Sequence, residues 1–306
     1  MQTALLIEQV LNGLQFGVML FLMAAGLTLI FGVMGVINLA HGSLYMIGAF
    51  ACAAVAMATG SFWLGLLASL AAAAAAGALV ELLVIRRLYH RDHLDQVLAT
   101  FALILIFSEG TRWLFGSFPL YLDIPPLLSG AIDLPGGARY QLYRLAIIVV
   151  GLGVAIGLYL LIAKTRLGMR IRAGESDREM IAALGVNIRA LYTAIFALGA
   201  ALAGLAGAMV GALQSVQVGM GEPVLILAFV VIVIGGIGSI KGALVGAALV
   251  GLVDTLGRFL LPKVFALFLG PSQGTTVGAA LASMLIYIVM ALILAFRPRG
   301  LFAASA

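Results

Sequence analysis

Long apolar stretches without charged residues recur along the whole chain. Each is close to the ~20 residues that a helix needs to cross a ~30 Å hydrocarbon core. Strands of a membrane barrel would instead alternate in polarity over about 10 residues, and this sequence does not alternate in that way. The chain is 64% hydrophobic and 9% charged, whereas about a quarter of the residues in a soluble domain are charged. The sequence therefore predicts an all-α polytopic membrane protein.

Nine stretches are long enough to be spans, and because their boundaries are soft we expect a bundle of about eight to ten transmembrane helices. The predicted spans run at 8–33, 35–58, 62–85, 94–111, 145–163, 190–213, 223–240, 243–262 and 275–296. The longest relatively polar stretch, about 112–144, is short and contains four prolines. We therefore expect one membrane domain over residues 1–306 and no separate soluble domain.

Basic residues predict the orientation, because short loops rich in Lys and Arg mark the cytoplasmic side. The nine-span arrangement places the clusters at 86–91, 164–189 and 297–299 and Lys241 on one side, which then carries 12 of the 17 Lys and Arg residues. The N-terminus is then periplasmic and the C-terminus cytoplasmic. The net charge of +5 is explained by this orientation. Nucleic-acid binding would need a concentrated basic face, so we expect no nucleic-acid partner.

Small residues predict close helix packing, since helices in lipid associate through backbone approach rather than a hydrophobic driving force. Three glycine pairs have the required four-residue spacing: Gly13 with Gly17, Gly207 with Gly211, and Gly242 with Gly246.

The stretch 164–189 is unusual, because it holds nine of the chain's 29 charged side chains. In hydrocarbon each charge would cost about 2.5–3.5 kcal/mol, so the segment lies in water or against another protein. Ser176 can cap a helix with Glu179 as its capping-box partner, and Gly185 can end it. The expected helix has a small apolar face formed by Met180, Ile181 and Leu184. It is either a solvated loop helix or a docking helix for a cytoplasmic partner.

A family resemblance favours docking. Glu179, followed six residues later by Gly185, resembles the coupling loop with which permeases of ABC importers contact their ATPases. Two features depart from that pattern: Met180 and Ile181 replace the paired alanines, and the downstream Leu-Pro is absent. The longer string "TRLGMRIRAGESDREMIAALGVN" resembles the branched-chain amino acid permeases of the LivH type more closely. The segments at 33–50 and 92–116 resemble the same family, in the same order.

This resemblance implies a permease subunit in the bacterial inner membrane that imports branched-chain or similar small amino acids. The implied partners are cytoplasmic ATP-binding subunits, a second and different permease subunit (a heterodimer), and a periplasmic substrate-binding protein. The implied coupling residues are Glu175, Ser176, Asp177, Arg178, Glu179 and Gly185. The sequence has no G-x-x-x-x-G-K-[ST] loop, so separate subunits would supply the ATP sites. Import of urea, short amides or aromatic acids by the same architecture stays open.

An internal similarity predicts broken helices near the substrate pathway. Residues 33–50 and 233–250 align without gaps, with five identical positions, and would form a parallel repeat. Interrupted backbone at membrane depth is tolerated only inside protein or beside a wet cavity. The pathway candidates are Asn38, His41, Ser43, Tyr45, Gln214, Gly235, Gly236, Gly238 and Ser239. The polar ones could instead form helix–helix hydrogen bonds.

Two other classes of function lack the residues that they need. A stand-alone secondary transporter or channel would need ionisable residues mid-membrane to bind a coupling ion, and the sequence offers almost none. An intramembrane enzyme would need a catalytic constellation, but neither a G-x-S-x-G elbow nor an H-E-x-x-H helix occurs. We therefore expect no catalytic residues, metal or cofactor.

Overall fold

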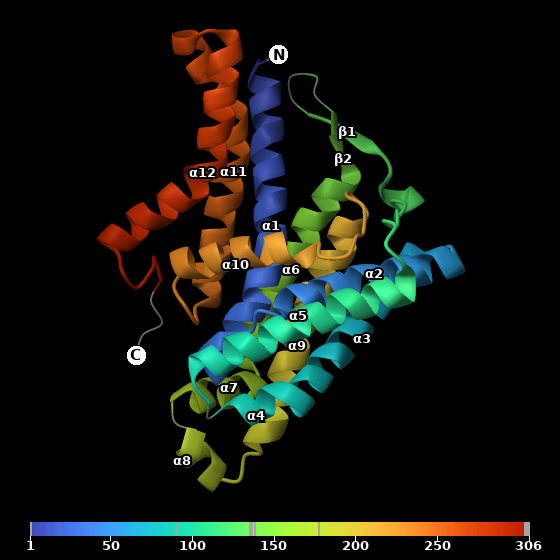
Figure 1. The fold of residues 1–306 in the computed structure, drawn as a ribbon, viewed down its shortest axis with the longest axis vertical. Coiled ribbons are helices and arrows are strands. Elements are labelled where there is room, and N and C mark those ends of the chain that lie inside the picture. Colours follow the sequence, from blue (N-terminus) through green and yellow to red (C-terminus); the bar gives the residue numbers. More distant parts are fainter. Residues whose placement is uncertain (1, 90, 135–136, 138, 177, 303–306) are drawn as a thin grey trace. The chain divides into compact units, whose positions relative to one another are not determined.

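The protein folds into helices along nearly its whole length (Figure 1). The computed structural model describes all residues except 1, 90, 135–136, 138, 177 and 303–306. Its helices are α1 (Gln2–Met34), α2 (His41–Thr59), α3 (Phe62–Val80), α4 (Arg86–Leu88), α5 (His93–Phe115), α6 (Leu142–Lys164), α7 (Arg166–Ser176), α8 (Arg178–Ala183), α9 (Ile188–Gly211), α10 (Gly221–Gly235), α11 (Ile240–Leu269) and α12 (Pro271–Phe296). A π-helical segment η1 (Glu81–Ile85), a 3₁₀ turn η2 (Pro126–Leu128) and the antiparallel strands β1 (Ala131–Asp133) and β2 (Arg139–Gln141) complete the described elements.

Within these described residues, eight helices are long and apolar enough to cross a membrane. One of them is the continuous run of α3, η1 and α4. The others are α1, α2, α5, α6, α9, α11 and α12. The predicted all-α polytopic membrane protein with eight to ten spans is confirmed.

The span predicted at 223–240 is shorter in the structure. Helix α10 has 15 residues and ends at Gly235, which gives it a length of about 22 Å, less than the ~30 Å hydrocarbon core. The helix stops there because Gly236 and Gly238 adopt positive φ angles of 102° and 83°. Ser239 then caps α11 by accepting a hydrogen bond from the Gly242 amide at 3.0 Å.

The chain divides into two compact units. Unit 1 comprises residues 1–21, 126–152 and 229–306. In it, α11 and α12 form an antiparallel pair that turns at Gly270. The first half of α1 packs on α11 through glycine: a Cβ added to Gly17 would lie 2.7 Å from the Ala247 carbonyl oxygen.

Unit 2 comprises residues 22–125 and 153–228. Its centre is the mutual packing of α2, α3 and α9. Added Cβ atoms would collide with backbone at Gly48, which faces Gly204, and at Gly207, which faces the Tyr45 carbonyl. Across the same contact the Ser69 hydroxyl donates to the Gly204 carbonyl at 2.9 Å. These close approaches are what the small-residue spacing predicted for Gly207, because only glycine lets backbones touch.

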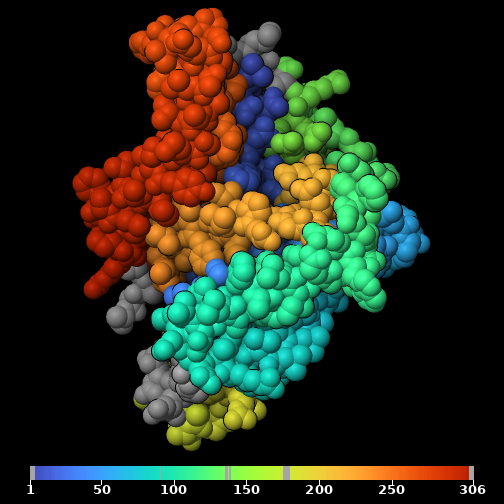
Figure 2. All heavy atoms as spheres, viewed as in Figure 1, coloured from blue at the N-terminus to red at the C-terminus, as the bar shows by residue number. Residues whose placement is uncertain are grey.

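Helix α5 forms an outer surface of unit 2 (Figure 2). Its exposed large apolar side chains include Leu94, Leu98, Phe101, Leu105 and Ile106. A surface of this composition suits contact with lipid chains rather than water.

Candidate functional site

The predicted break between the first two spans is present in unit 2. Helix α1 ends at Met34, and α2 begins only at His41. The intervening backbone is held by two side-chain amides: Asn38 Oδ1 accepts from the Ala40 amide at 3.0 Å, and Gln96 Oε1 accepts from the Ile37 amide at 3.4 Å. A buried broken helix of this kind needs such partners.

His41, the first residue of α2, is buried deep in unit 2. A Cβ added to Gly26 of α1 would lie 2.9 Å from His41 Nε2 and 2.5 Å from the Gly199 carbonyl oxygen. Gly199 is the twelfth of the 24 residues of α9. The start of α2 therefore lies beside the midpoint of a full membrane span.

The start of α10 lies against the start of α2. A Cβ added to Gly42 would lie 2.7 Å from the Gly221 carbonyl oxygen, and the Gly219 amide donates to Met46 Sδ at 3.3 Å. Each helix N-terminus carries a partial positive charge of roughly half an electron. Two such ends meeting inside the protein can attract a small anionic group.

The predicted pathway residues fall into two sets. Asn38, His41, Ser43 and Tyr45 are all buried in unit 2. Gln214 is exposed, in the connection between α9 and α10. Gly235, Gly236, Gly238 and Ser239 belong to unit 1.

Two of the pathway candidates in unit 1 contact the C-terminal segment. The Gly235 carbonyl accepts from the Phe302 amide at 2.9 Å. A Cβ added to Gly236 would lie 2.5 Å from the Phe302 carbonyl oxygen. Gly235 and Gly236 therefore hold the C-terminal segment through a hydrogen bond and a close backbone contact. Both aligned segments are helix–break–helix, yet a parallel repeat remains a prediction.

The charged segment 164–189 forms two helices, α7 and α8. Sequence reasoning expected only one helix, starting after Ser176. The side chains of Glu175, Ser176, Arg178 and Glu179 and the whole of Asp177 lie outside the described residues. The predicted capping box and the coupling roles of these residues therefore stay predictions.

The predicted helix end at Gly185 is confirmed. Gly185 has a φ of 85° and its amide donates to the Ala182 carbonyl at 3.0 Å. The Val186 amide donates to the Ile181 carbonyl at 3.2 Å. This pair of bonds is the Schellman motif, which needs a left-handed residue and so favours glycine.

The predicted apolar face of this helix is divided. Ile181 is buried, whereas Met180 and Leu184 are 57% and 76% exposed. Both α7 and α8 contact α9, and Leu191 of α9 lies against Gly174 of α7. The segment is thus attached to the first turns of α9 and keeps two large apolar side chains on its outside.

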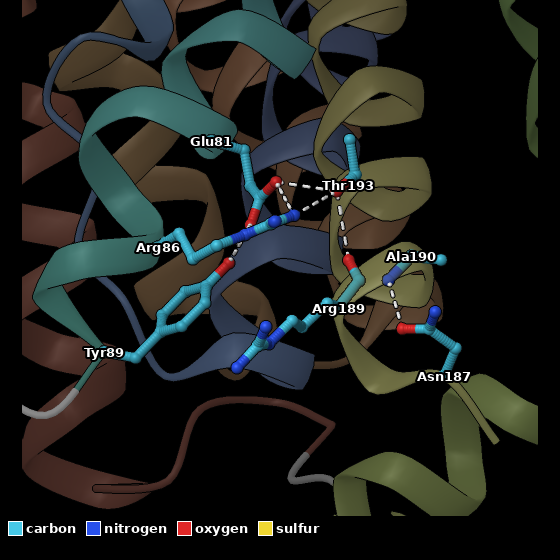
Figure 3. Close-up of polar contacts among 7 residues, drawn as sticks. All are labelled: Glu81, Arg86, Tyr89, Asn187, Arg189, Ala190 and Thr193. Carbon is cyan, nitrogen blue, oxygen red and sulfur yellow. Dashed lines mark hydrogen bonds and ion pairs between the residues drawn. The ribbon is translucent and has the colours of Figure 1, made fainter. Parts of the chain in front are cut away.

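A buried polar cluster joins the end of α3 to the same turns of α9 (Figure 3). The Glu81 carboxylate is fully buried and accepts from Arg86 Nε at 3.1 Å and Arg86 Nη2 at 2.9 Å. It also accepts from the Tyr89 and Thr193 hydroxyls, each at 2.7 Å. We call these four residues the Glu81 cluster. Burial raises the pKa of Tyr89, and its hydrogen bond to Glu81 raises it further, so Tyr89 stays a donor.

Sequence reasoning missed the Glu81 cluster. In a regular α-helix, residues five apart lie on different faces, so Glu81 and Arg86 do not read as a pair. The π-helical turn η1 changes this, because the Arg86 amide bonds to the Glu81 carbonyl five residues back. The available signal was Glu81 itself, a lone carboxylate in an otherwise uncharged stretch from 62 to 85.

Among the described residues, eight apolar helices long enough to be spans and a charged helical segment outside them define a multi-pass helical membrane protein. The family model for branched-chain amino acid transport system permease components matches residues 9–295. The chain belongs to this family.

Curated relatives agree with the family. The chain is 31% identical to the high-affinity branched-chain amino acid transport system permease protein BraD of Pseudomonas aeruginosa, over 96% of this chain and 95% of BraD. It is 28% identical to LivH of Escherichia coli, over 83% of this chain and 87% of LivH. It is 26% identical to a probable LivH of Methanocaldococcus jannaschii, over 92% and 89%. No solved structure shows significant similarity to the chain.

Proposed function

We propose that the chain is the membrane-spanning subunit of an ABC importer, which passes branched-chain or similar small amino acids into the cytoplasm. The family match over residues 9–295 carries the proposal. BraD and LivH are named for branched-chain amino acids, which favours this cargo over urea, short amides or aromatic acids. The subunit has a transport role and no catalytic one.

The substrate path in this proposal runs past the meeting helix starts of α2 and α10. The carboxylate of an amino acid suits the positive end of a helix. Asn38, His41, Ser43 and Tyr45 lie on the first turn of α2 and the break before it. Because the path offers few polar groups, the permease would bind the substrate only weakly and transiently. A periplasmic binding protein would set the specificity for the substrate. Gln214 and the glycines at 235, 236 and 238 with Ser239 are secondary candidates.

Coupling in this proposal starts at α8. Cytoplasmic ATP-binding subunits would contact the 175–185 segment, including the exposed Met180 and Leu184. Movement of α7 and α8 would reach the first turns of α9, which they contact. The bond between Thr193 and Glu81 would carry it to α3. A second permease subunit would complete the path.

Charge reversal in the docking segment tests the coupling role. We expect Glu179→Lys and Asp177→Arg to leave membrane insertion intact but to reduce substrate uptake per ATP hydrolysed in vesicles holding the complete transporter. The matched control is Glu109→Lys, which reverses an exposed charge on α5. Normal uptake and normal ATPase binding in both docking variants would disprove the docking role. Uptake that persists without ATPase subunits would favour a secondary transporter.

Orientation has its own test. The proposal places residue 176 and the C-terminus in the cytoplasm and the N-terminus in the periplasm. This orientation needs nine crossings, so the short helix α10 must count as a crossing beside the eight candidate spans. Ser176→Cys, combined with Cys52→Ala, should react with an impermeant thiol reagent only in inverted vesicles or permeabilised cells. Labelling from the periplasmic face of intact cells would invert the topology and remove the importer reading.

A further inference from the structure

A pocket of about 590 Å³ lies between η1 and α4 on one side and the first turns of α9 on the other. This volume is in the range of small-molecule sites. The pocket is lined by Leu82, Arg86, Asn187, Arg189, Ala190, Thr193, Ala194 and Ala197. Neither the proposed substrate path nor the proposed ATPase contact uses it.

The lining is amphiphilic along its length. Ala190, Ala194 and Ala197 follow one another at spacings of four and three, so they share one face of α9. Together with Leu82 they form an apolar floor. Among the polar lining residues, Asn187 and Arg189 precede this face at the start of α9. Arg86 of α4 donates to the hydroxyl of Thr193, which lies beside the face.

One positive charge in this lining has no carboxylate partner among the described residues. Arg86 is paired with Glu81. Arg189 is exposed and has no carboxylate partner among the residues that the structure describes. Figure 3 shows its side chain extending from α9 toward the side of Tyr89. Within the described part of the chain, the pocket therefore presents a guanidinium without a carboxylate partner, with the side chains of Asn187 and Thr193 on its wall.

The location selects the ligand. The pocket lies at the ends of two candidate spans, one ending at Leu88 and the other beginning at Ile188. These are the depths at which lipid phosphates lie, with acyl chains toward the apolar floor. Basic pockets between membrane helices bind anionic headgroups, and guanidinium is the preferred partner of phosphate.

We propose that this pocket binds an anionic phospholipid, with its phosphate at Arg189 and its glycerol and first acyl methylenes along the alanine face of α9. A lipid headgroup and a soluble phosphate ester would both present a phosphate to Arg189. The membrane beside the pocket supplies the lipid form, a phosphate diester. The bound lipid would brace the α3–α9 junction that holds the Glu81 cluster. The site does not depend on the transported substrate.

Native mass spectrometry of the complete transporter released from nanodiscs tests this proposal. The nanodiscs contain phosphatidylglycerol and phosphatidylcholine in equal amounts. We expect selective retention of phosphatidylglycerol, lowered about tenfold in Arg189→Gln because a charge-assisted hydrogen bond is lost. Arg170→Gln is the matched control, since it removes an exposed arginine of α7 outside the pocket. It should retain the lipid as the wild type does.

A steric variant distinguishes lipid binding in the pocket from a general effect of surface charge on lipid retention. Ala194→Phe fills the floor and keeps every charge, and it should also lower phosphatidylglycerol retention. Equal retention in wild type, Arg189→Gln and Ala194→Phe would overturn the proposal. Displacement of phosphatidylglycerol by millimolar glycerol 3-phosphate would show a soluble phosphate site and overturn the lipid assignment. Occupation of the pocket by the ATPase subunits instead of a lipid would also overturn the lipid proposal.

Discussion

The Glu81 cluster gives the sharpest test of how the α3–α9 junction is held. In Glu81→Gln the shape is kept, but the charge that receives four hydrogen bonds is lost. A hydrogen bond to a charged group contributes about 1.5–3 kcal/mol and a neutral one about 1 kcal/mol. The bonds from Tyr89 and Thr193 should therefore weaken by about 1 kcal/mol each. We expect a loss of about 2 kcal/mol in the free energy of unfolding, leaving out Arg86, which can reach water.

The assay is SDS-driven unfolding in mixed micelles, combined with a double-mutant cycle against Thr193→Val. The two changes should be coupled by about 1 kcal/mol, because Glu81→Gln weakens the hydrogen bond that Thr193→Val removes. The control is Glu109→Gln, which breaks the exposed pair of Glu109 with Arg112. Exposed pairs contribute about 0–1 kcal/mol. If Glu81→Gln and Glu109→Gln have equal effects, or if the coupling is zero, the structural reasoning is refuted.

Two glycine predictions follow. Gly26→Ala should destabilise the protein by about 1–3 kcal/mol through overpacking, because its Cβ would lie 2.5 Å from the Gly199 carbonyl oxygen. Gly110→Ala should be neutral or slightly stabilising in the same unfolding assay, because an added Cβ would have no neighbouring atom outside its own stretch of helix within 4 Å. A larger loss of stability in Gly110→Ala than in Gly26→Ala would contradict the packing. Gly185→Ala places a Cβ at a φ of 85° and should cost about 1 kcal/mol. Amide hydrogen exchange in residues 178–186 should then be about fivefold faster, and an unchanged rate would contradict the role of the left-handed turn.

Hydropathy and turn chemistry made much of the fold predictable. The spans could be placed because lipid requires long uncharged stretches. The end of α8 could be placed because Gly185 is a local signal that needs no tertiary contact. The length of α10 could not be predicted, since the apolar run continues past Gly235 and only the positive φ angles at 236 and 238 stop the helix.

The candidate site was less accessible from sequence. Asn38 and His41 could be singled out as polar residues in an apolar segment. The place of His41 beside the midpoint of α9 could not be predicted. That place depends on a contact between Gly26 and Gly199, which are far apart in the chain. The Glu81 cluster depends on a π-helical turn and on a partner more than 100 residues away, Thr193. Neither a π-helical turn nor a contact between distant residues produces a periodic pattern in the sequence.

The backbone-to-backbone packing of α2, α3 and α9 has a mechanical consequence. At Gly48, Gly204 and Gly207 these helices approach backbone to backbone, so few side chains there can repack. Sliding or rotating one helix would drive carbonyl oxygens into neighbouring Cα atoms. We expect the three helices to move together as one rigid unit, with the non-helical connections at 35–40 and 212–220 among its hinges. Stiffening either connection should slow opening and closing without changing what is recognised.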